Sequence, residues 1–409
     1  MSVPPPRSAS ALATPNFLLF WLAQAISKFG DPITVVALAA ITYRLTGSAL
    51  YTTAALLVAT VPQATFGFFA GAIADALGHR RAMIVADLLR TVLIGAIPLV
   101  LQAELPLAVA YVLVLAAGLC SAVFSPARVS LLPTLLTREQ LMSGNSAVYA
   151  TDRAVEIAGA VAGGLLVASL GAAVFYVDAL TFLVSALLLL RVSVSEAPPR
   201  AVSWGQAFGE GLVGLRVIRD SVVLRANTVF SLLAQLCIPI LTGLLPVLIF
   251  RRFAPDDLER GAVLFGVAEA AIAAGAVIGS LVLPRLSRRI RKGRLVIAGF
   301  ASCGASLVAA AYAPGYELLL VALVVTGFTN VLFFVPNMAI LQEHAPVRSR
   351  GAVIGARISL LSLTWLPVAL MAGGLADVAD VAFLIAGAGA FTVVVALAAV
   401  RLPAVAEVP

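Results

Sequence analysis

Apolar runs of membrane-spanning length follow one another along the chain and constrain its fold more than any other feature. A helix needs about 20 apolar residues to cross the hydrocarbon core of a bilayer. About twelve runs approach that length, and they lie at Phe17–Tyr43, Tyr51–Ala74, Ala82–Leu101, Leu107–Phe124, Ser146–Leu170, Ala172–Arg191, Asn227–Phe250, Ala262–Pro284, Leu295–Ala313, Leu318–Asn337, Val353–Leu375 and Val381–Val400. The sequence therefore predicts an all-α membrane protein with twelve transmembrane helices.

The composition excludes a water-soluble fold. Of the 409 residues, 61% are hydrophobic and 11% are charged, and the mean hydropathy is +1.06. Soluble domains carry about 25% charged residues. The net charge of +7 would suit a nucleic-acid partner, but the basic residues lie between apolar runs and not on one soluble face. We therefore expect the lipid bilayer as a partner, and no nucleic acid.

The connections between the runs differ in charge, and this difference predicts the orientation of the helices. Connections rich in Lys and Arg stay in the cytosol. Every second connection is rich in them, as at Arg80–Arg81, Arg285–Arg294 and Arg348–Arg350. The alternate connections are richer in acidic residues, such as Glu104, Asp256, Asp257, Glu317, Asp377 and Asp380. We expect a multi-pass protein of a bacterial-type inner membrane with both termini in the cytosol.

The two halves of the chain repeat one another. Asn16 with Leu22-Ala-Gln24 recurs as Asn227 with Leu233-Ala-Gln235, and Ala162–Leu165 recurs as Ala372–Leu375. Parallel repeats of this kind place a substrate site at their interface, near the middle of the bilayer. The expected organisation is a disordered tail over 1–15, a six-helix bundle over 16–191, a cytosolic linker over 192–226, a pseudo-symmetric six-helix bundle over 227–401 and a tail over 402–409. The linker contains a weakly amphipathic segment, Trp204–Ile218, which can lie at the membrane interface.

A short polar connection, Gly71–Arg81, separates the second and third apolar runs. Gly71 and Gly78 permit close helix approach and a turn of positive φ. Asp75 can cap a helix or pair with a base, and Arg80 and Arg81 form a cationic pair at the membrane edge. The pattern G-x-x-x-D-x-x-G-basic-basic resembles the loop between helices 2 and 3 of major facilitator superfamily transporters.

The resemblance extends over essentially the whole chain, and it is nearest to the branch of siderophore exporters and macrolide-type drug efflux proteins. It is carried by Asn16-Phe17, Trp21-Leu-x-Gln24, Gly30-Asp31, Leu45–Ala49, Ala86–Arg90 and Asp178–Phe182. The helix-5 glycines Gly159, Gly163 and Gly164 resemble an antiporter motif, although Ala160 stands where that motif has proline. The glycines also suit close helix packing. The resemblance implies a rocker-switch transporter of two bundles.

Several charged residues fall inside the apolar runs. Such charges cost about 3 to more than 10 kcal/mol at the centre of a bilayer, so they face a cavity or a partner. Lys28 and Asp31 share one side of a helix. Our hypothesis is that Asp31 faces a central cavity and titrates, with Lys28 tuning it; the alternative is a static ion pair. Glu156 is a second candidate for protonation, and Glu269 is a third or a partner for a cationic substrate.

Other charges are expected at the cytosolic ends of the helices. Asp152 and Arg153 are predicted to form a gate pair, and Arg128 reads as a topology anchor. Asp87, one turn from Arg90, is assigned to a structural cluster that would tie the two halves together in the closed state. That cluster consists of Asp75, Arg81, Asp87 and Arg357. Asp178 is expected to cap a helix or to pair within the first half.

The cysteines and histidines predict no cofactor or metal. Cys120, Cys237 and Cys303 lie in three separate runs and are read as buried free thiols, while His79 and His344 fall in predicted loops. No G-x-x-x-x-G-K-[ST] loop is present, so a proton gradient is the expected energy source. The absence of H-E-x-x-H and G-x-S-x-G motifs argues against an enzyme.

The predicted function is proton-coupled export of a lipophilic or amphipathic small molecule by a monomer. Two parallel halves favour alternating access over a channel. An uptake or facilitated-diffusion permease of the same fold remains an alternative, as does a transport-inactive membrane sensor or assembly partner. Sodium is an alternative coupling ion.

Overall fold

The computed structural model describes residues 12, 14–194, 213–346 and 349–407, and these residues are almost entirely helical. The helices of the first half are α1 (Pro15–Thr46), α2 (Ala49–Thr65), α3 (Gly67–Leu77), α4 (His79–Gln102), α5 (Leu107–Leu135), α6 (Arg138–Leu170) and α7 (Val174–Leu190). Residues 213–220 are helical. The second half then contains α9 (Val222–Ala234), α10 (Cys237–Arg252), α11 (Leu258–Leu286), α12 (Lys292–Ala311), α13 (Tyr316–His344), α14 (Arg350–Ala376), α15 (Val381–Ala399) and α16 (Pro403–Ala406).

Every predicted membrane run corresponds to helix in the described structure. Within the described residues, 10 stretches are long and apolar enough to cross a membrane, and one of them, Ser143–Leu190, contains both α6 and α7. A shorter apolar helix, Ala49–Ala59, belongs to α2. The second and seventh runs are each divided, into α2 and α3 and into α9 and α10. The prediction of an all-α membrane protein with twelve spans in two bundles is confirmed.

The break between α9 and α10 has a local cause. Pro239 has no N–H to donate to the carbonyl of Gln235, four residues earlier, and its ring crowds that carbonyl. Helix α9 accordingly ends at Ala234, and α10 begins at Cys237. The repeat partner of this segment, around Gln24, has no proline at the matching place, and α1 continues through it without a break.

The described part of the predicted linker, from residue 213 onward, is largely helical. Helix α9 begins at Val222, inside the predicted linker, and Val217 and Ile218 pack against Leu341 and Val353 of the second half. This end of the amphipathic segment therefore lies on protein. The rest of that segment, through residue 212, lies outside the described residues, as do residues 1–11 and 13 of the predicted disordered tail.

Four further boundaries differ from the sequence-based expectation. Helix α1 begins at Pro15 and so takes in the last residue of the predicted tail. His79 is the first residue of α4 and His344 the last residue of α13, so neither histidine lies in a loop. The predicted C-terminal tail contains α16, whose Val405 is buried against the second half.

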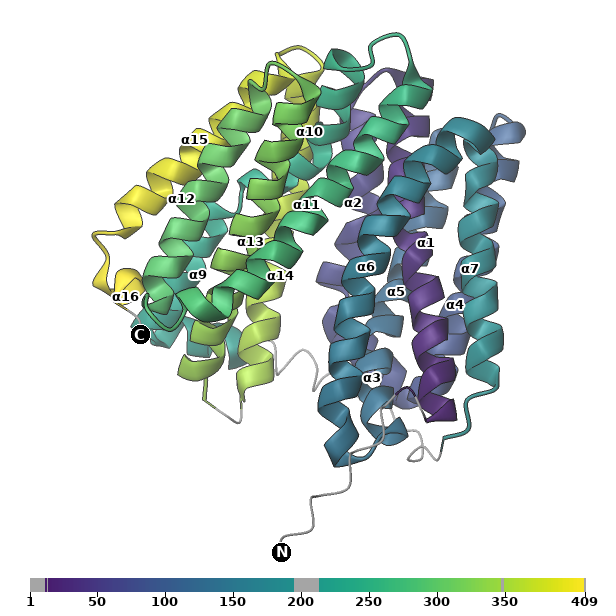
Figure 1. Ribbon diagram of the computed structural model, residues 1–409, viewed down its shortest axis with the longest axis horizontal. Coiled ribbons are helices and arrows are strands. Elements are labelled where there is room, and N and C mark those ends of the chain that lie inside the picture. Colours follow the sequence, from purple (N-terminus) through teal and green to yellow (C-terminus); the bar gives the residue numbers. More distant parts are fainter. Residues whose placement is uncertain (1–11, 13, 195–212, 347–348, 408–409) are drawn as a thin grey trace, which may run out of the picture.

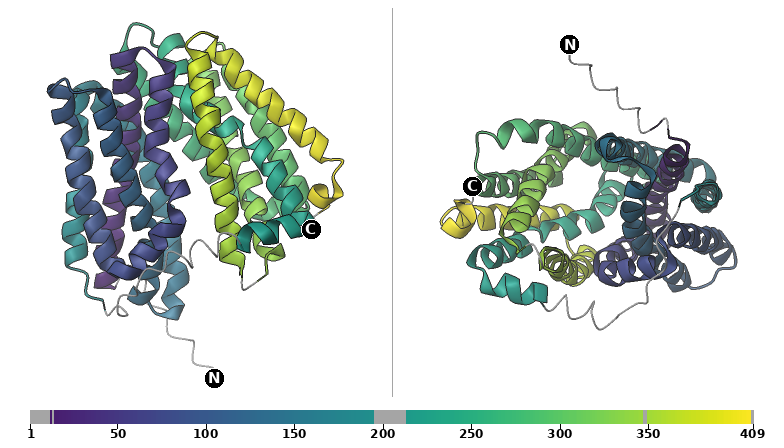
Figure 2. Two further views of the ribbon diagram at one scale, coloured as in Figure 1. Left: turned by 180° about the vertical axis from the view of Figure 1, so that it is seen from behind. Right: turned by 90° about the horizontal axis from the view of Figure 1, so that it is seen from below.

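The two halves lie side by side and form a V (Figure 1). They meet at the end that holds the α1–α2 and α14–α15 connections, which we call the sealed end. They diverge at the end where α1 begins, which we call the splayed end, and the view from behind shows the same arrangement (Figure 2). The main contacts between the halves join α6 to α11 and α2 to α14.

Apolar packing between the halves is concentrated toward the sealed end. One buried cluster there joins Val36 and Leu56 of the first half to Leu241, Leu245 and further residues of the second. The cluster around Phe17, Met83 and Leu131 lies near the splayed end and contains residues of the first half alone, among those described. The core is thus shared at one end and separate at the other.

Close backbone approach holds the interface between α6 and α11. A methyl group added at Gly266 would lie 2.3 Å from the carbonyl oxygen of Ala160, and one at Gly164 would lie 2.6 Å from that of Ala262. Any larger residue at these positions would push the helices apart. Small residues are the general means by which membrane helices approach closely.

Candidate functional site

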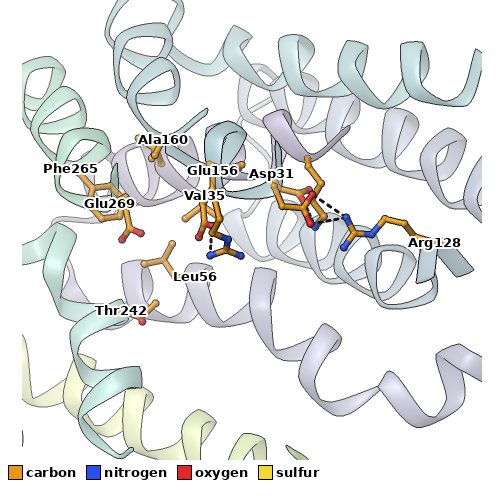
Figure 3. A pocket seen from close by; sticks show the side chains of 14 residues that line it. Asp31, Val35, Leu56, Arg128, Glu156, Ala160, Thr242, Phe265 and Glu269 are labelled. Carbon is orange, nitrogen blue, oxygen red and sulfur yellow. Dashed lines mark hydrogen bonds and ion pairs between the residues drawn. The ribbon is translucent and has the colours of Figure 1, made fainter. Parts of the chain in front are cut away.

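A cavity of about 470 Å³ lies between the two halves. This volume falls within the range of about 300 to 1,000 Å³ that is typical of small-molecule sites. Helices α1, α2, α5 and α6 supply its wall on one side, and α10 and α11 supply Thr242, Phe265 and Glu269 on the other (Figure 3). The remaining lining residues are Lys28, Asp31, Pro32, Val35, Val36, Leu56, Arg128, Asp152, Arg153, Glu156 and Ala160.

Asp31 lies on α1, at the boundary between this cavity and the interior of the first half. Its Oδ2 accepts a hydrogen bond from Lys28 Nζ at 2.8 Å, and its Oδ1 accepts one from Arg90. The expected Lys28–Asp31 pair is therefore present. Asp31 also lines a second, smaller cavity of about 90 Å³ within the first half, together with Arg90 and Asp178. One carboxylate thus borders both spaces.

Arg90 of α4 connects Asp31 to a buried polar network. Its Nη1 lies 3.7 Å from Asp87 Oδ1, and its guanidinium carbon lies 3.6 Å from the centre of the Phe182 ring. Asp87 also accepts a hydrogen bond from Ser27 at 3.3 Å. Because the Asp87 side chain is fully buried, its charge depends on these partners.

Asp178 of α7 belongs to the same buried region. It accepts hydrogen bonds from Thr34 Oγ1 at 2.5 Å and from Thr181 Oγ1 at 3.2 Å. The sequence predicted that Asp178 would either cap a helix or pair within the first half, and the structure shows the pairing. The glycine of Gly30-Asp31 is explained by this contact, because a methyl group at Gly30 would overlap the Asp178 carboxylate.

The residues proposed as a cytosolic gate pair are not partners of one another. Asp152 is held by Arg128, whose Nη1 lies 3.0 and 2.9 Å from its two carboxylate oxygens. Arg153 instead pairs with Glu156, at 2.7 Å. Arg128 also donates to Gln24 Oε1 at 2.5 Å. Arg128 is thus a wall residue of the cavity (Figure 3) in addition to any effect on topology.

Glu269 of α11 differs from the other three carboxylates of the cavity. Asp31, Asp152 and Glu156 each have a basic partner, whereas Glu269 has no hydrogen bond or ion pair with any residue that the structure describes. The like charge of Glu156 acts on it from the opposite half. Figure 3 shows both side chains directed into the cavity from opposite halves. Glu259 also lies on α11, at its first turn.

The three glycines of the antiporter-like motif, Gly159, Gly163 and Gly164, lie on α6 and allow close packing against two different helices. A methyl group at Gly159 would lie 2.6 Å from the carbonyl oxygen of Phe29, and one at Gly163 would lie 3.0 Å from the Cα of Ile33. Both contacts are to α1. Gly164 packs on α11 of the opposite half. The motif therefore fixes α6 between the two halves.

The polar connection Gly71–Arg81 lies at the splayed end. Gly78 has φ +81°, as expected for the turn. Gly71 lies within α3, and a methyl group there would meet none of the described side chains or backbone within 4 Å, so the expected close helix approach is not seen among them. Asp75 lies 3.8 Å from His79 Nδ1. Arg80 donates to the carbonyl oxygens of Leu189 and Leu190 at the end of α7, and Arg81 is exposed.

The proposed cluster of Asp75, Arg81, Asp87 and Arg357 is not assembled in this conformation. Arg357 of α14 is buried and donates to Ser231 Oγ at 2.8 Å, within the second half. Asp87 accepts a hydrogen bond from Ser27 and forms an ion pair with Arg90, both within the first half. Because the halves diverge at this end, contacts of these residues across the halves remain a proposal for the closed state.

The contacts that close the sealed end were not singled out from the sequence. Asp377, just after α14, accepts hydrogen bonds from Ala49 N and Ser48 Oγ, both at 2.7 Å. It therefore caps the first turn of α2 in the opposite half, where unpaired N–H groups favour an anion. Arg251 donates to the carbonyl oxygen of Ala376 at 2.6 Å and lies 3.5 Å from Asp377. The excess of acidic residues in this connection was the available signal.

The cysteines are free thiols in the described structure. Cys237 and Cys303 are buried and Cys120 is only half-buried, so the expectation of burial is wrong for Cys120. The Cys237 thiol donates to the carbonyl oxygen of Ala234 at 3.4 Å. No group of three His, Cys, Asp or Glu side chains within the described residues could hold a metal ion.

Known proteins resemble this chain along most of its length. The multidrug efflux pump Tap of Mycolicibacterium fortuitum is 30% identical over 373 residues, which cover 88% of this chain and 89% of that protein. Macrolide efflux protein A of Streptococcus pyogenes is 24% identical, with 88% and 89% covered. The enterobactin exporter EntS of Escherichia coli O1:K1 / APEC is 28% identical, with 70% and 67% covered.

The fold has solved counterparts as well. The nucleoside transporter NupG superposes with a TM-score of 0.77 at 13% identity, and 94% of this chain and 98% of that chain are covered. The family model of the major facilitator superfamily matches residues 20–366 and 262–407. These matches agree with the resemblance to efflux and siderophore-export proteins. The chain belongs to the major facilitator superfamily of transporters.

Proposed function

We propose that the protein exports lipophilic or amphipathic small molecules in exchange for protons, by alternating access of a central cavity. The observation that carries this proposal is the cavity itself. It lies between two halves that are joined by apolar and polar contacts at one end and diverge at the other. The efflux pumps among the relatives support transport in the export direction.

The charge distribution supports a cavity that opens to the cytosol. Arg80 and Lys292 lie in the first turns of α4 and α12, near the splayed end, while Asp377 and Asp380 lie at the sealed end. Basic connections stay in the cytosol. The conformation is therefore inward-facing, ready to receive a compound from the cytosol or the inner leaflet. Both termini would be cytosolic, and the proposed transporter would work as a monomer, because residues of one chain line the cavity from both halves.

Asp31 is the proposed coupling carboxylate. It borders the cavity and joins it, through Arg90, to the buried network of the first half. When Asp31 takes up a proton, its pairs with Lys28 and Arg90 weaken, and this frees α1 to move relative to α4. A titrating group that changes its ion pairs in this way can bias a two-state equilibrium.

Everted membrane vesicles from a pump-deficient bacterial host provide the test. With an acid interior imposed, the wild-type protein should take up rhodamine 6G or Nile red, and nigericin should abolish that uptake. Asp31→Asn should lose at least about nine-tenths of the gradient-driven uptake, consistent with the factor of ten per 1.4 kcal/mol of coupling. Asp220→Asn, an exposed linker carboxylate, is the matched control and should match wild type.

Four outcomes would contradict the proposal. Uptake of neither dye by the wild-type protein would favour a sensor or assembly role. Uptake that requires the opposite gradient would indicate an importer. Gradient-driven uptake at the wild-type level in Asp31→Asn would show that this residue does not couple transport to protons. Uptake that depends on a sodium gradient instead of a pH gradient would show that sodium is the coupling ion.

A further inference from the structure

The charges of the central cavity do not balance on its two sides. On the first-half side, Lys28, Arg128 and Arg153 are matched by Asp31, Asp152 and Glu156. Arg90, behind Asp31 and outside the cavity lining, has the buried Asp87 as a further partner. On the second-half side, Glu269 is the one charged residue among those that line the cavity. The unmatched charge is therefore negative, and it lies on the wall opposite the ion pairs.

A carboxylate at this depth needs a partner. An unpaired charge inside a membrane protein costs several kcal/mol, so it is found beside a counter-charge or on a ligand pathway. The described residues offer Glu269 only the like charge of Glu156 from across the cavity. Arg153, the nearest basic side chain by sequence to Glu156, is already engaged with that residue at 2.7 Å. A cationic ligand would satisfy Glu269 where the protein does not.

The rest of the wall indicates an organic cation instead of a metal ion. Val35, Val36, Leu56, Ala160 and Phe265 give the cavity an apolar lining around the carboxylate. Calcium and magnesium require about six or more oxygen ligands. A lipophilic cation could place its apolar body against these residues and its charge at Glu269. Phe265, one turn before Glu269 on α11, belongs to this apolar part of the wall.

We propose that Glu269 is the specificity-determining residue of the cavity and selects lipophilic organic cations over neutral or anionic compounds of similar size. This inference rests on the proposed transport function, because it names the class of compound that the cavity accepts. The carboxylate comes from α11, and the ion pairs opposite come from the first half. A bound cation would therefore contact both halves at once.

Equilibrium binding to the purified full-length protein in nanodiscs tests the inference without any gradient or transport. The probes are three aryl compounds of similar bulk, tetraphenylphosphonium (cation), triphenylphosphine oxide (neutral) and tetraphenylborate (anion). Wild-type protein should bind the cation at least about tenfold more tightly than either other probe, as one close charge pair can supply. Glu269→Gln should abolish that preference, and Glu269→Asp should retain most of it.

The matched control is Glu259→Gln, the same change on the same helix but outside this cavity. It should leave all three affinities unchanged. Glu269→Lys should reverse the preference toward tetraphenylborate. Size-exclusion profiles identify any variant that fails to fold, and the wild-type comparison of the three probes does not depend on the variants.

The inference is overturned if wild-type protein binds none of the probes, binds them without charge preference, or keeps its preference in Glu269→Gln. Its failure can be told apart from that of the proposed function. Gradient-driven uptake of Nile red with no charge preference in binding would leave export standing and remove the role of Glu269. Charge-selective binding without gradient-driven uptake would leave the ligand class standing and remove export.

Discussion

Arg90 illustrates how much depends on single side chains in this protein. It is the cation shared by Asp31 and Asp87, and its side chain is 5% exposed. Arginine suits this place because its planar group donates in several directions at once and also stacks on the Phe182 ring. Lysine has a single charged nitrogen and could not serve all three neighbours equally.

Removal of Arg90 should therefore be costly. Arg90→Met would leave Asp87 buried without its cation, and breaking a buried pair from one side costs about 3 to 5 kcal/mol. We expect a clearly lower melting temperature in detergent, together with loss of gradient-driven uptake. Arg81→Met, an exposed arginine of the same helix, is the control. Equal melting temperatures for the two variants would show that the buried network contributes little to stability.

Sequence reasoning found the residues of the site more readily than their partners. Lys28 and Asp31 could be paired from their spacing, because they lie one turn apart on one helix. Arg90 and Asp31, or Arg128 and Asp152, come from different helices, and their pairing depends on packing that no local pattern encodes. Asp152 and Arg153 pair with other residues and not with one another, because adjacent residues on a helix point in different directions. Their role as a gate stays a prediction.

At the scale of helices, the interface between α6 and α11 depends on the absence of side chains. Gly266→Ala would place a methyl group 2.3 Å from the carbonyl oxygen of Ala160, a backbone atom that cannot turn aside. We expect the helices to separate there, with transport reduced at least about tenfold, a loss equivalent to roughly 1.4 kcal/mol. Dye uptake by everted vesicles measures the effect.

Gly387→Ala is the matched control for that change. Gly387 lies within α15, and a methyl group there would meet nothing within 4 Å. This variant should transport like wild type, because alanine is the better helix former at an open position. If both variants transport equally well, the close approach of α6 and α11 is not needed for activity.

The capping of α2 by Asp377 makes a separate prediction about the sealed end. Asp377→Asn removes the anion from the first turn of α2 and weakens the contact with Arg251. Since these contacts join the two halves, their loss should shift the population toward the outward-facing state. A cysteine at Thr242, which lines the cavity, should then react faster with an impermeant maleimide added outside intact cells.

Asp380→Asn provides the control at the same end. Asp380 caps α15 through Phe383 N at 2.9 Å, and this contact lies within the second half. The change removes the same charge three residues away but leaves the interface intact. An equal acceleration of labelling in both variants would show that charge alone, and not the cap on α2, controls the sealed end.

The number of spans and the division into two halves were the features most readily predicted from the sequence. The conformation, inward- or outward-facing, was the feature least open to prediction. Apolar runs and the alternation of basic connections are repeated many times, so they predict the number of spans and the two halves despite local errors such as the break at Gln235. Which end is sealed depends instead on a few contacts of small free energy, such as those of Asp377 and Gly243 with α2. A difference of a few kcal/mol between two states leaves no pattern in the sequence.

Distances between spin labels on the two halves test the central claim most directly. One pair joins Leu77 to Gln342 at the splayed end, and the other joins Ala103 to Val378 at the sealed end; all four positions are exposed. When the pH is lowered or tetraphenylphosphonium is added, alternating access predicts that one distance distribution shortens while the other lengthens. Two distributions that stay fixed, or that lengthen together, would contradict a cavity opened to each side in turn.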